Sequence, residues 1–243
     1  RAGTPMTSAT ESSTDPLPTP SGPHGVGRTS FDWVDPTRRE QYSADGRGQR
    51  ELVVWAWSPA DGDASSPGPA YLPEGWAPSV EFIGIPSTGL RSHAAHDAPL
   101  SSAAQRYPVL VLSPSGFPPL LLSALAEELA SQGYVVAGIN HTYEPAVTVF
   151  DDGRVVPANP AATAGTLGPQ TGSHEAAFRA RAEVCATKAL DFAFVADQLH
   201  EPDGDPQSRF AVRLDLTRFG AVGHSFGGNA ALEWCRTDAR CRA

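Results

Sequence analysis

Residues 218–232 read Arg218-Phe-Gly-Ala-Val-Gly-His-Ser-Phe-Gly-Gly-Asn-Ala-Ala-Leu232. Residues 218–223 form a short, mostly apolar run that predicts a buried strand, and the small residues from Ser225 on predict a closely packed helix to about residue 236. The turn between them, Gly223-His-Ser-Phe-Gly227, matches G-x-S-x-G, in which a serine occupies a tight strand-to-helix turn. We therefore predict Ser225 as a nucleophile. The alternative is a glycine-rich turn in which the serine only caps the helix.

Upstream of this motif the chain predicts a strand, a helix and a second strand. Residues 109–112, Val-Leu-Val-Leu, are a continuous apolar run typical of a strand buried on both faces, and residues 134–139 repeat that pattern. Between them Pro118 and Pro119 start a predicted helix over residues 119–132, and Gly133 lies where a left-handed C-cap belongs. The predicted apolar stripe of this helix consists of Leu121, Leu122, Leu125 and Leu129. Two buried strands joined by a helix predict parallel pairing with a right-handed crossover.

The rest of the chain supplies another strand, a long helix and a leader. Residues 50–57 are rich in β-branched and aromatic side chains and predict a strand. Residues 1–28 are rich in Thr, Ser, Pro and Gly, which predicts a flexible leader. A long helix precedes residue 201, and its predicted apolar face consists of Phe178, Ala182, Cys185, Ala189, Phe192, Ala196 and Leu199. On this face we expect Cys185 to be a buried, inert thiol. The alternation of strands and helices predicts an α/β fold with a doubly wound, mostly parallel sheet.

Composition excludes several classes of protein. The 243 residues are enough for one large domain, and no run approaches the roughly 18 apolar residues of a membrane span. The net charge of −9, from 27 acidic and 18 basic residues, argues against nucleic acid as a partner. Of the basic residues only Lys188 is a lysine, a bias that we attribute to base composition of the gene rather than to function.

A serine nucleophile needs hydrogen-bond donors for the oxyanion. In this kind of site they are the backbone N–H after the serine and one from the loop after the central strand. Phe226 follows Ser225, and Gly116 lets the loop Leu112-Ser-Pro-Ser-Gly-Phe117 turn the Phe117 N–H inward. We predict Phe117 and Phe226 as the oxyanion donors. The alternative for residues 112–117 is an ordinary Pro-Gly loop.

Five segments together resemble one known family: Trp33-Val-Asp-Pro-Thr-Arg-Arg-Glu40, the strand from Arg50, Asp97-Ala-Pro-Leu100, Tyr107-Pro-Val-Leu-Val-Leu-Ser113 and Gly223-His-Ser-Phe-Gly-Gly228. They look like the α/β-hydrolases of the platelet-activating-factor acetylhydrolase type, which include bacterial relatives described as lipases and carboxylesterases. The resemblance runs from about Thr29 to Ala243. It implies Ser225 as nucleophile, Phe117 and Phe226 as oxyanion donors, no metal or cofactor, and hydrolysis of short-acyl or lipid-like esters through an acyl-enzyme. The chain departs from many members at Ser113-Pro-Ser-Gly116, where they have Ser-His-Gly or Ser-Pro-Gly.

The rest of a catalytic triad is not visible in the sequence. This fold orders its triad as Ser, then Asp or Glu, then His, yet no His follows Ser225, and the acids that follow, Glu233 and Asp238, fall on or just after the nucleophile helix. The resemblance places the acid after a strand that begins near residue 241, and the base later still. We therefore expect residues 29–243 to be the N-terminal part of a hydrolase domain, truncated after the nucleophile strand and helix and inactive alone.

Four histidines are further candidates for site residues. His141 follows a buried strand at the carboxyl edge of the sheet and is predicted to contact substrate, the alternative being a solvated strand end. An upstream His could replace the missing base, but His224 is not expected to do so, because adjacent side chains diverge at a tight turn. His93 and His96 have a metal-ligand spacing but no visible third ligand, so we predict no metal site.

The sequence leaves the pairing of two cysteines, the cellular location and the exact activity open. Cys235 and Cys241 flank the end of the nucleophile helix and would close a small loop in an oxidising compartment. A secreted or cell-envelope location is favoured, and the oligomeric state is not predicted. The same machinery would serve a lipase or a polyester hydrolase, and the missing acid and base would also permit a non-catalytic α/β-hydrolase fold that binds a ligand.

Overall fold

A computed structural model of the chain describes residues 17–62, 68–86, 88–167, 173–200, 210 and 212–243. Its elements are β1 (Gly25–Arg39), β2 (Gln49–Ala60), α1 (Pro78–Glu81), β3 (Ala94–His96), β4 (Tyr107–Ser113), the 3₁₀ helix η1 (Pro119–Leu122), α2 (Ser123–Ser131), β5 (Val135–Asn140), β6 (Val147–Val149), β7 (Val155–Pro157), α3 (Pro160–Leu167), α4 (His174–His200), β8 (Leu214–Gly223) and α5 (Phe226–Thr237). In the described residues no helix combines the length and the apolar character needed to cross a bilayer.

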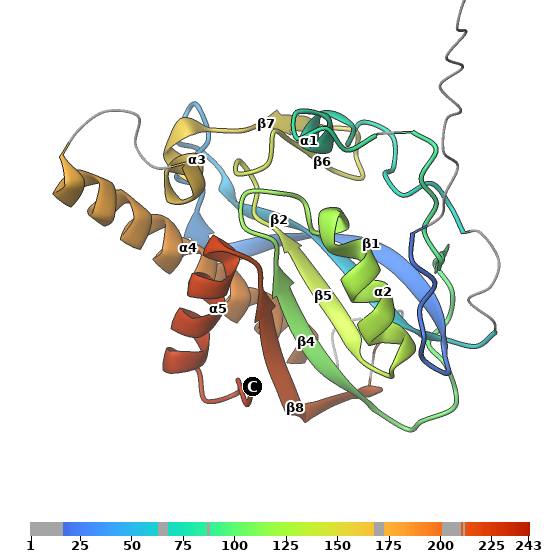
Figure 1. The fold of residues 1–243 in the computed structure, drawn as a ribbon. Coiled ribbons are helices and arrows are strands. Elements are labelled where there is room, and N and C mark those ends of the chain that lie inside the picture. The colour runs from blue at the N-terminus through green and yellow to red at the C-terminus, as the bar shows by residue number, and fades with distance from the viewer. Residues whose placement is uncertain (1–16, 63–67, 87, 168–172, 201–209, 211) are drawn as a thin grey trace, which may run out of the picture.

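The central sheet of the described residues has six strands in the order β3-β1-β2-β5-β4-β8 (Figure 1). The strands β5, β4 and β8 are parallel, whereas β2 pairs antiparallel with both β1 and β5. Because β4 lies between β5 and β8, the segments that follow these three strands emerge at one edge of the sheet. In register, Leu112 is opposite Gly138, and Ser113 is opposite Gly223. The turn that carries Ser225 therefore lies beside the loop that starts at Ser113.

Helices cover both faces of the sheet, and the strands alternate between them. In β2, Leu52, Val54 and Ala56 face a core shared with α4 and α5, whereas Val53, Trp55 and Trp57 face a core shared with α2. This period of two is what a strand buried on both faces requires. Figure 1 shows α2 on one face of β4 and β5, with α4 and α5 on the other. The α/β-hydrolase architecture predicted from the sequence is confirmed.

The predicted helix after β4 is present, but its buried face differs from the prediction. It begins as η1 and continues as α2, and Gly133 has the predicted left-handed conformation, with φ of +96°. The residues that it buries are Leu120, Ser123, Ala126, Glu127, Ala130 and Ser131. Leu125, which we placed on the apolar stripe, is 43% exposed. The other three leucines of the predicted stripe are partly buried against the core, so the prediction was wrong for Leu125 and for the centre of the buried face, where small side chains let the helix pack closely on the sheet.

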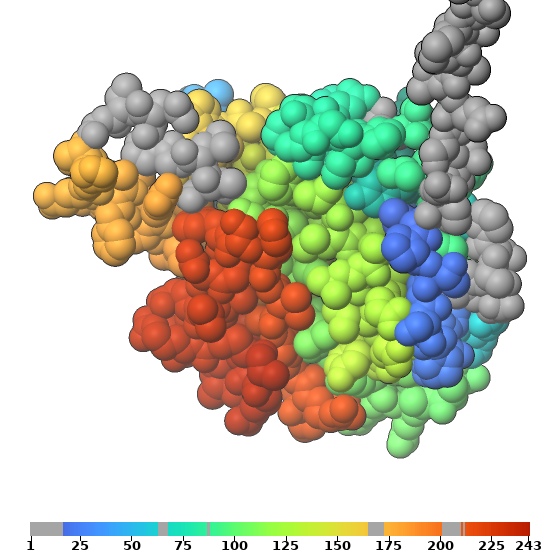
Figure 2. All heavy atoms as spheres, in the orientation of Figure 1, coloured from blue at the N-terminus to red at the C-terminus, as the bar shows by residue number. Residues whose placement is uncertain are grey.

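The predicted boundary of the leader at residue 28 is also wrong. Residues 1–16 lie outside the described part of the chain, but β1 already begins at Gly25 and pairs with the end of β2. The Arg28 guanidinium is buried, donates to the carbonyls of Ala70 and Tyr71, and lies over the Trp55 ring. Before β1, Ser21 donates from its N–H and hydroxyl to Glu128 of α2 (Figure 2 shows this first segment in blue beside α2). Backbone pairing and these hydrogen bonds order a segment that has few apolar side chains.

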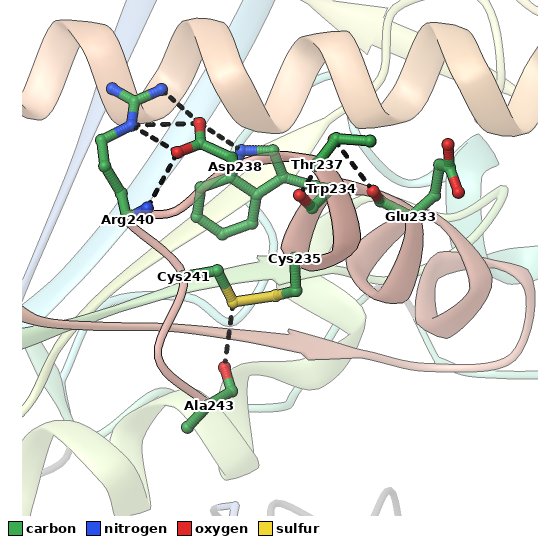
Figure 3. Close-up of a disulfide and its surroundings, with 8 residues drawn as sticks. All are labelled: Glu233, Trp234, Cys235, Thr237, Asp238, Arg240, Cys241 and Ala243. Atoms are coloured by element: carbon green, nitrogen blue, oxygen red, sulfur yellow. Dashed lines mark hydrogen bonds and ion pairs between the residues drawn. A yellow bond between two sulfur atoms is a disulfide. The ribbon is translucent and has the colours of Figure 1, made fainter.

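A disulfide between Cys235 and Cys241 joins α5 to the segment that follows it (Figure 3). Arg242 N–H donates to the Phe219 carbonyl and Ala221 N–H donates to the Ala243 carbonyl, so residues 241–243 lie parallel to the outer edge of β8. This agrees with the strand that we expected to begin near residue 241. The disulfide thus connects α5 to the strand edge beside it.

Thiol counting tests the disulfide. Under denaturing, non-reducing conditions we expect one reactive thiol, that of Cys185, because Cys235 and Cys241 are bonded. A Cys235→Ser, Cys241→Ser double variant should lose about 2 kcal/mol of unfolding free energy, the chain-entropy value for so short a loop. Chemical denaturation of both proteins measures the difference. A count of three thiols in the untreated protein would contradict the bond.

Candidate active site

Ser225 occupies a strained turn between β8 and α5. Its backbone has φ of 54° and ψ of −124°, which non-glycine residues rarely adopt and which costs of order 1–3 kcal/mol. The side chain is exposed, and although Ser225 lies at the N-cap position of α5 it makes no capping hydrogen bond. Within the described residues its hydroxyl has no hydrogen-bond partner. This geometry does not fit the alternative of a capping serine, and it is compatible with the tight strand-to-helix turn that the G-x-S-x-G motif predicts.

Two glycines make the turn possible through close approach of backbones. A Cβ on Gly223 would lie 2.5 Å from the Gly227 carbonyl carbon and oxygen. A Cβ on Gly227 would overlap the Ser113 carbonyl oxygen and lie 2.7 Å from the Ser113 Oγ. The first glycine therefore lets the turn close on itself, and the second lets α5 pack against the end of β4. The G-x-S-x-G spacing follows from these contacts.

The loop of residues 113–117 lies against this turn. The His224 N–H donates to the Ser113 carbonyl at 3.0 Å, which joins the end of β4 to the residue before Ser225. Phe226 provides the first N–H of α5, and the Phe117 N–H lies on the adjoining loop; neither donates to an acceptor within the described residues. Two free donors at this edge are what an oxyanion hole needs. The residues that we predicted as donors therefore belong to segments that the structure brings together.

A cleft of about 500 Å³ opens beside Ser225. It is lined by Ser225 and Phe226 together with Asn229 of α5 and with Phe178, Arg181, Ala182 and Cys185 of α4. Phe178 is 76% exposed, so the predicted apolar face of α4 is buried only in its second half. Cys185 is half-buried on the cleft wall instead of fully buried, and burial raises the pKa of its thiol. On the other side of the site, Phe82 stacks on the Phe117 ring.

His141 lies inside the protein and not at a solvated strand end. Its side chain is 0% exposed, and its Nε2 lies 2.9 Å from Ser113 Oγ while its Nδ1 lies 2.8 Å from Asp191 Oδ2. Burial, together with the charge of Lys188, lowers the pKa of His141 to about 3, although Asp191 opposes the shift. The imidazole is therefore neutral, with Nδ1–H donating to Asp191 and Nε2 accepting from the Ser113 hydroxyl. In this arrangement His141 is not among the residues that line the cleft beside Ser225, which does not support the substrate contact that we expected.

Asp191 connects several elements through its two carboxylate oxygens. They accept from Arg50 Nε and Nη2 at 3.2 and 2.7 Å and from His141, and Arg38 Nη1 lies 2.9 Å away. Burial disfavours the charged carboxylate, but Arg50 and the hydrogen bond from His141 hold the pKa of Asp191 well below its usual range. Arg50 also pairs with Glu40 at 3.0 Å. The carboxylate is therefore ionised and fixes the tautomer of His141.

Lys188 is a second buried charge on α4, three residues before Asp191. Its Nζ donates to the Ser115 carbonyl at 3.1 Å and pairs with Glu144 at 2.6 Å. Burial raises the pKa of Glu144, although Lys188 opposes the shift. Lys188 and Asp191 were not predicted as site residues, because neither belongs to the apolar face that the sequence indicates for α4. One signal was available: Lys188 is the only lysine among 18 basic residues, so a gene that otherwise uses arginine keeps a lysine at this position.

Other titratable residues do not complete a triad at Ser225. Glu233 pairs with Arg236, and Asp238 accepts from Arg240 and from the Trp234 indole N–H, at the far end of α5. All seven histidines lie within the described residues, and none hydrogen-bonds to Ser225. His93 Nε2 contacts the Leu17 carbonyl and His96 contacts Asp97. Among the described residues no cluster of three His, Cys, Asp or Glu side chains is arranged to hold a metal.

Comparison with known proteins supports the resemblance found in the sequence. The family model described as platelet-activating factor acetylhydrolase, isoform II, matches residues 76–159. The chain is 27% identical over 165 residues to the platelet-activating factor acetylhydrolase of Cavia porcellus, which covers 61% of this chain and 36% of that protein. It superposes on the ferulic acid esterase from Streptomyces cinnamoneus with a TM-score of 0.71 and 30% identity, which covers 94% of this chain and 60% of that one. The chain thus spans less than two thirds of the length of either relative.

Alanine at Gly227 tests the close packing of the turn on β4. Gly227→Ala should lower the unfolding free energy by about 2 kcal/mol, because its Cβ meets the Ser113 backbone, which cannot move aside cheaply. Gly228→Ala is the matched control: its Cβ lies 3.3 Å from the nearest atom, and helix propensity favours the change by up to about 1 kcal/mol. Urea denaturation measures both. Equal stability of the two variants would show that the contact is not constraining.

Proposed function

We propose that this chain, an α/β-hydrolase of the platelet-activating factor acetylhydrolase type, contributes the nucleophile and the oxyanion hole of a serine ester hydrolase. The observation that carries the proposal is the Ser225 turn: an exposed serine in strained backbone, held at the carboxyl edge of a parallel sheet and not used as a helix cap. A chain that only bound a ligand would have no need to keep this strain.

The proposed reaction has two steps. Ser225 Oγ attacks the ester carbonyl carbon and loses its proton to a general base, and the carbonyl electron pair moves to the oxygen, which accepts hydrogen bonds from the Phe117 and Phe226 N–H groups. The tetrahedral intermediate then expels the alcohol, which takes up the proton, and leaves an acyl-enzyme. Water attacks this ester in the same way and releases the acid and free Ser225. The chemistry requires no metal or cofactor.

The general base is the part of the machinery that the histidines of this chain do not supply. His141 is buried and its Nε2 already accepts from Ser113, and among the described residues no hydrogen bond joins the His224 side chain to its neighbour Ser225. The acids after Ser225 are paired with arginines. We therefore propose that residues 1–243 by themselves lack both the base and the acid of the triad.

We propose short-acyl or lipid-like esters as the substrates. The names of the relatives support an ester, and Phe178, Ala182 and Phe226 give the cleft an apolar wall. The negative net charge and the open cleft do not favour nucleic acid. The disulfide supports a secreted or cell-envelope location, because such bonds persist in oxidising compartments. Hydrolysis of p-nitrophenyl acetate, butyrate and palmitate, compared with methyl ferulate, would rank acyl length against an aromatic acid.

Replacement of the nucleophile tests the mechanism. In the full-length gene product, Ser225→Ala should abolish labelling by a fluorophosphonate probe and lower the rate of p-nitrophenyl acetate hydrolysis at least about 1,000-fold, because no other group forms the acyl-enzyme. Ser102→Ala, an exposed serine outside the site, is the control and should keep both properties. A folded wild-type protein that the probe does not label would reject the enzyme and leave a ligand-binding fold.

Comparison of two lengths tests the missing base. Residues 1–243 alone should hydrolyse p-nitrophenyl acetate at least about 100-fold more slowly than the full-length gene product, since general base catalysis contributes about 10²–10⁴-fold. Circular dichroism and gel filtration check that both proteins are folded. Equal rates would place the base among the histidines of this chain, and His224→Ala and His141→Ala would then identify it.

A further inference from the structure

Two buried charged residues of α4 reach the loop of residues 113–117 from inside the protein. Lys188 donates directly to the Ser115 carbonyl, and Asp191 acts through His141, whose Nε2 accepts from the Ser113 hydroxyl. They lie three residues apart on one face of the helix. Lys188, Asp191 and His141 are fully buried, and none of them lines the cleft beside Ser225.

This arrangement is more costly than an apolar core would be. Removing a carboxylate and an ammonium from water is unfavourable, and apolar residues of similar volume often stabilise a fold equally well. What the charges add is direction, since one chain of hydrogen bonds ends at the Ser115 carbonyl and the other at the Ser113 hydroxyl, both in one loop. Ser113 in turn accepts from the His224 N–H and packs against Gly227. The chain of contacts therefore runs from α4 to the turn that carries Ser225.

Ser113, His141 and Asp191 have the hydrogen-bond order of a catalytic triad, but they are not one. All three side chains are fully buried, and the Ser113 carbonyl and Oγ are covered by Gly227. A substrate carbonyl cannot approach Ser113 without unpacking α5 from β4. The ordered hydrogen bonds must act on the position of the loop instead.

We propose that Asp191, His141 and Lys188 are positioning residues that hold residues 113–117 where the Phe117 N–H meets the oxyanion formed at Ser225. The proposal rests on the proposed function, in which Phe117 is an oxyanion donor. It assigns to His141 an indirect role in catalysis in place of contact with substrate.

Two variants of the full-length gene product remove the His141–Ser113 contact and the Lys188–Ser115 contact separately. Ser113→Ala removes only the hydroxyl that His141 holds. Lys188→Met combined with Glu144→Gln removes the bond to Ser115 without leaving one buried charge unpaired. Glu127→Gln is the control, because Glu127 is also buried and accepts from Ser92 and His93, but lies on α2 and does not reach the loop.

The readout is the rate with p-nitrophenyl acetate relative to its thionoester, in which sulfur replaces the carbonyl oxygen. A well-placed oxyanion hole favours oxygen, since sulfur is larger and accepts hydrogen bonds poorly. We expect both test variants to lose about 10–100-fold in kcat with KM changed less than twofold, and to lose about tenfold in the oxygen-to-sulfur rate ratio. The control should keep the wild-type ratio even if it is less stable.

The outcomes separate this inference from the proposed function. A folded wild-type protein without ester hydrolysis or probe labelling rejects the proposed function, and the inference falls with it. An active wild type whose folded variants keep the wild-type ratio rejects the inference alone. If neither variant folds, the contacts serve the fold and not the loop, which also overturns the inference.

Discussion

The ionised carboxylate of Asp191 is the group on which the polar contacts among β2, β5 and α4 depend. It lies where β2, the end of β5 and α4 meet, and it accepts from Arg50, Arg38 and His141 at once. Removing one member of such a buried set commonly costs about 3–5 kcal/mol, because a charge is then left buried without its counterion. Arg50 would be that charge here, with Glu40 as its only remaining carboxylate among the described residues. The position of His141, and so of Ser113, follows from this one group.

The helix α4 has two different halves. Its first half is largely exposed and supplies Phe178 and Arg181 to the cleft, whereas its second half is buried and supplies the aromatic and aliphatic side chains of one core. Lys188 and Asp191 lie where the two halves meet. The same helix therefore contributes to the core at one end and to a wall of the cleft at the other.

Much of the site could be predicted because its signals are local. Five residues around Ser225, the apolar run before them and the small residues after them identify the turn, and the loop after β4 could be recognised from Gly116 and the run that precedes it. The buried faces of α2 and α4 could not be read in the same way. In α2, Ala126 and Ala130 are buried because they are small, whereas Leu125 is exposed. In α4, Asp191 is buried because Arg50, 141 residues away in the chain, pairs with it. A period of 3.6 in apolar residues detects neither case. The sequence correctly placed His141 at the end of a strand, but the direction of its side chain depends on Asp191, which lies 50 residues later in the chain.

The loop at residues 113–116 shows why such a network is useful at this place. Within Ser113-Pro-Ser-Gly116, Ser115 adopts a left-handed backbone with φ of 73°. That conformation is unfavourable for serine and persists only where the surroundings hold it. The residue whose carbonyl receives the Lys188 ammonium is this same Ser115. The hydrogen bonds at Ser113 and Ser115 hold the loop on both sides of Pro114, next to the proposed oxyanion donor Phe117. Lys188 and Ser115 are therefore best understood as one structural unit, in which α4 supplies the restraint that the unfavourable backbone of Ser115 requires.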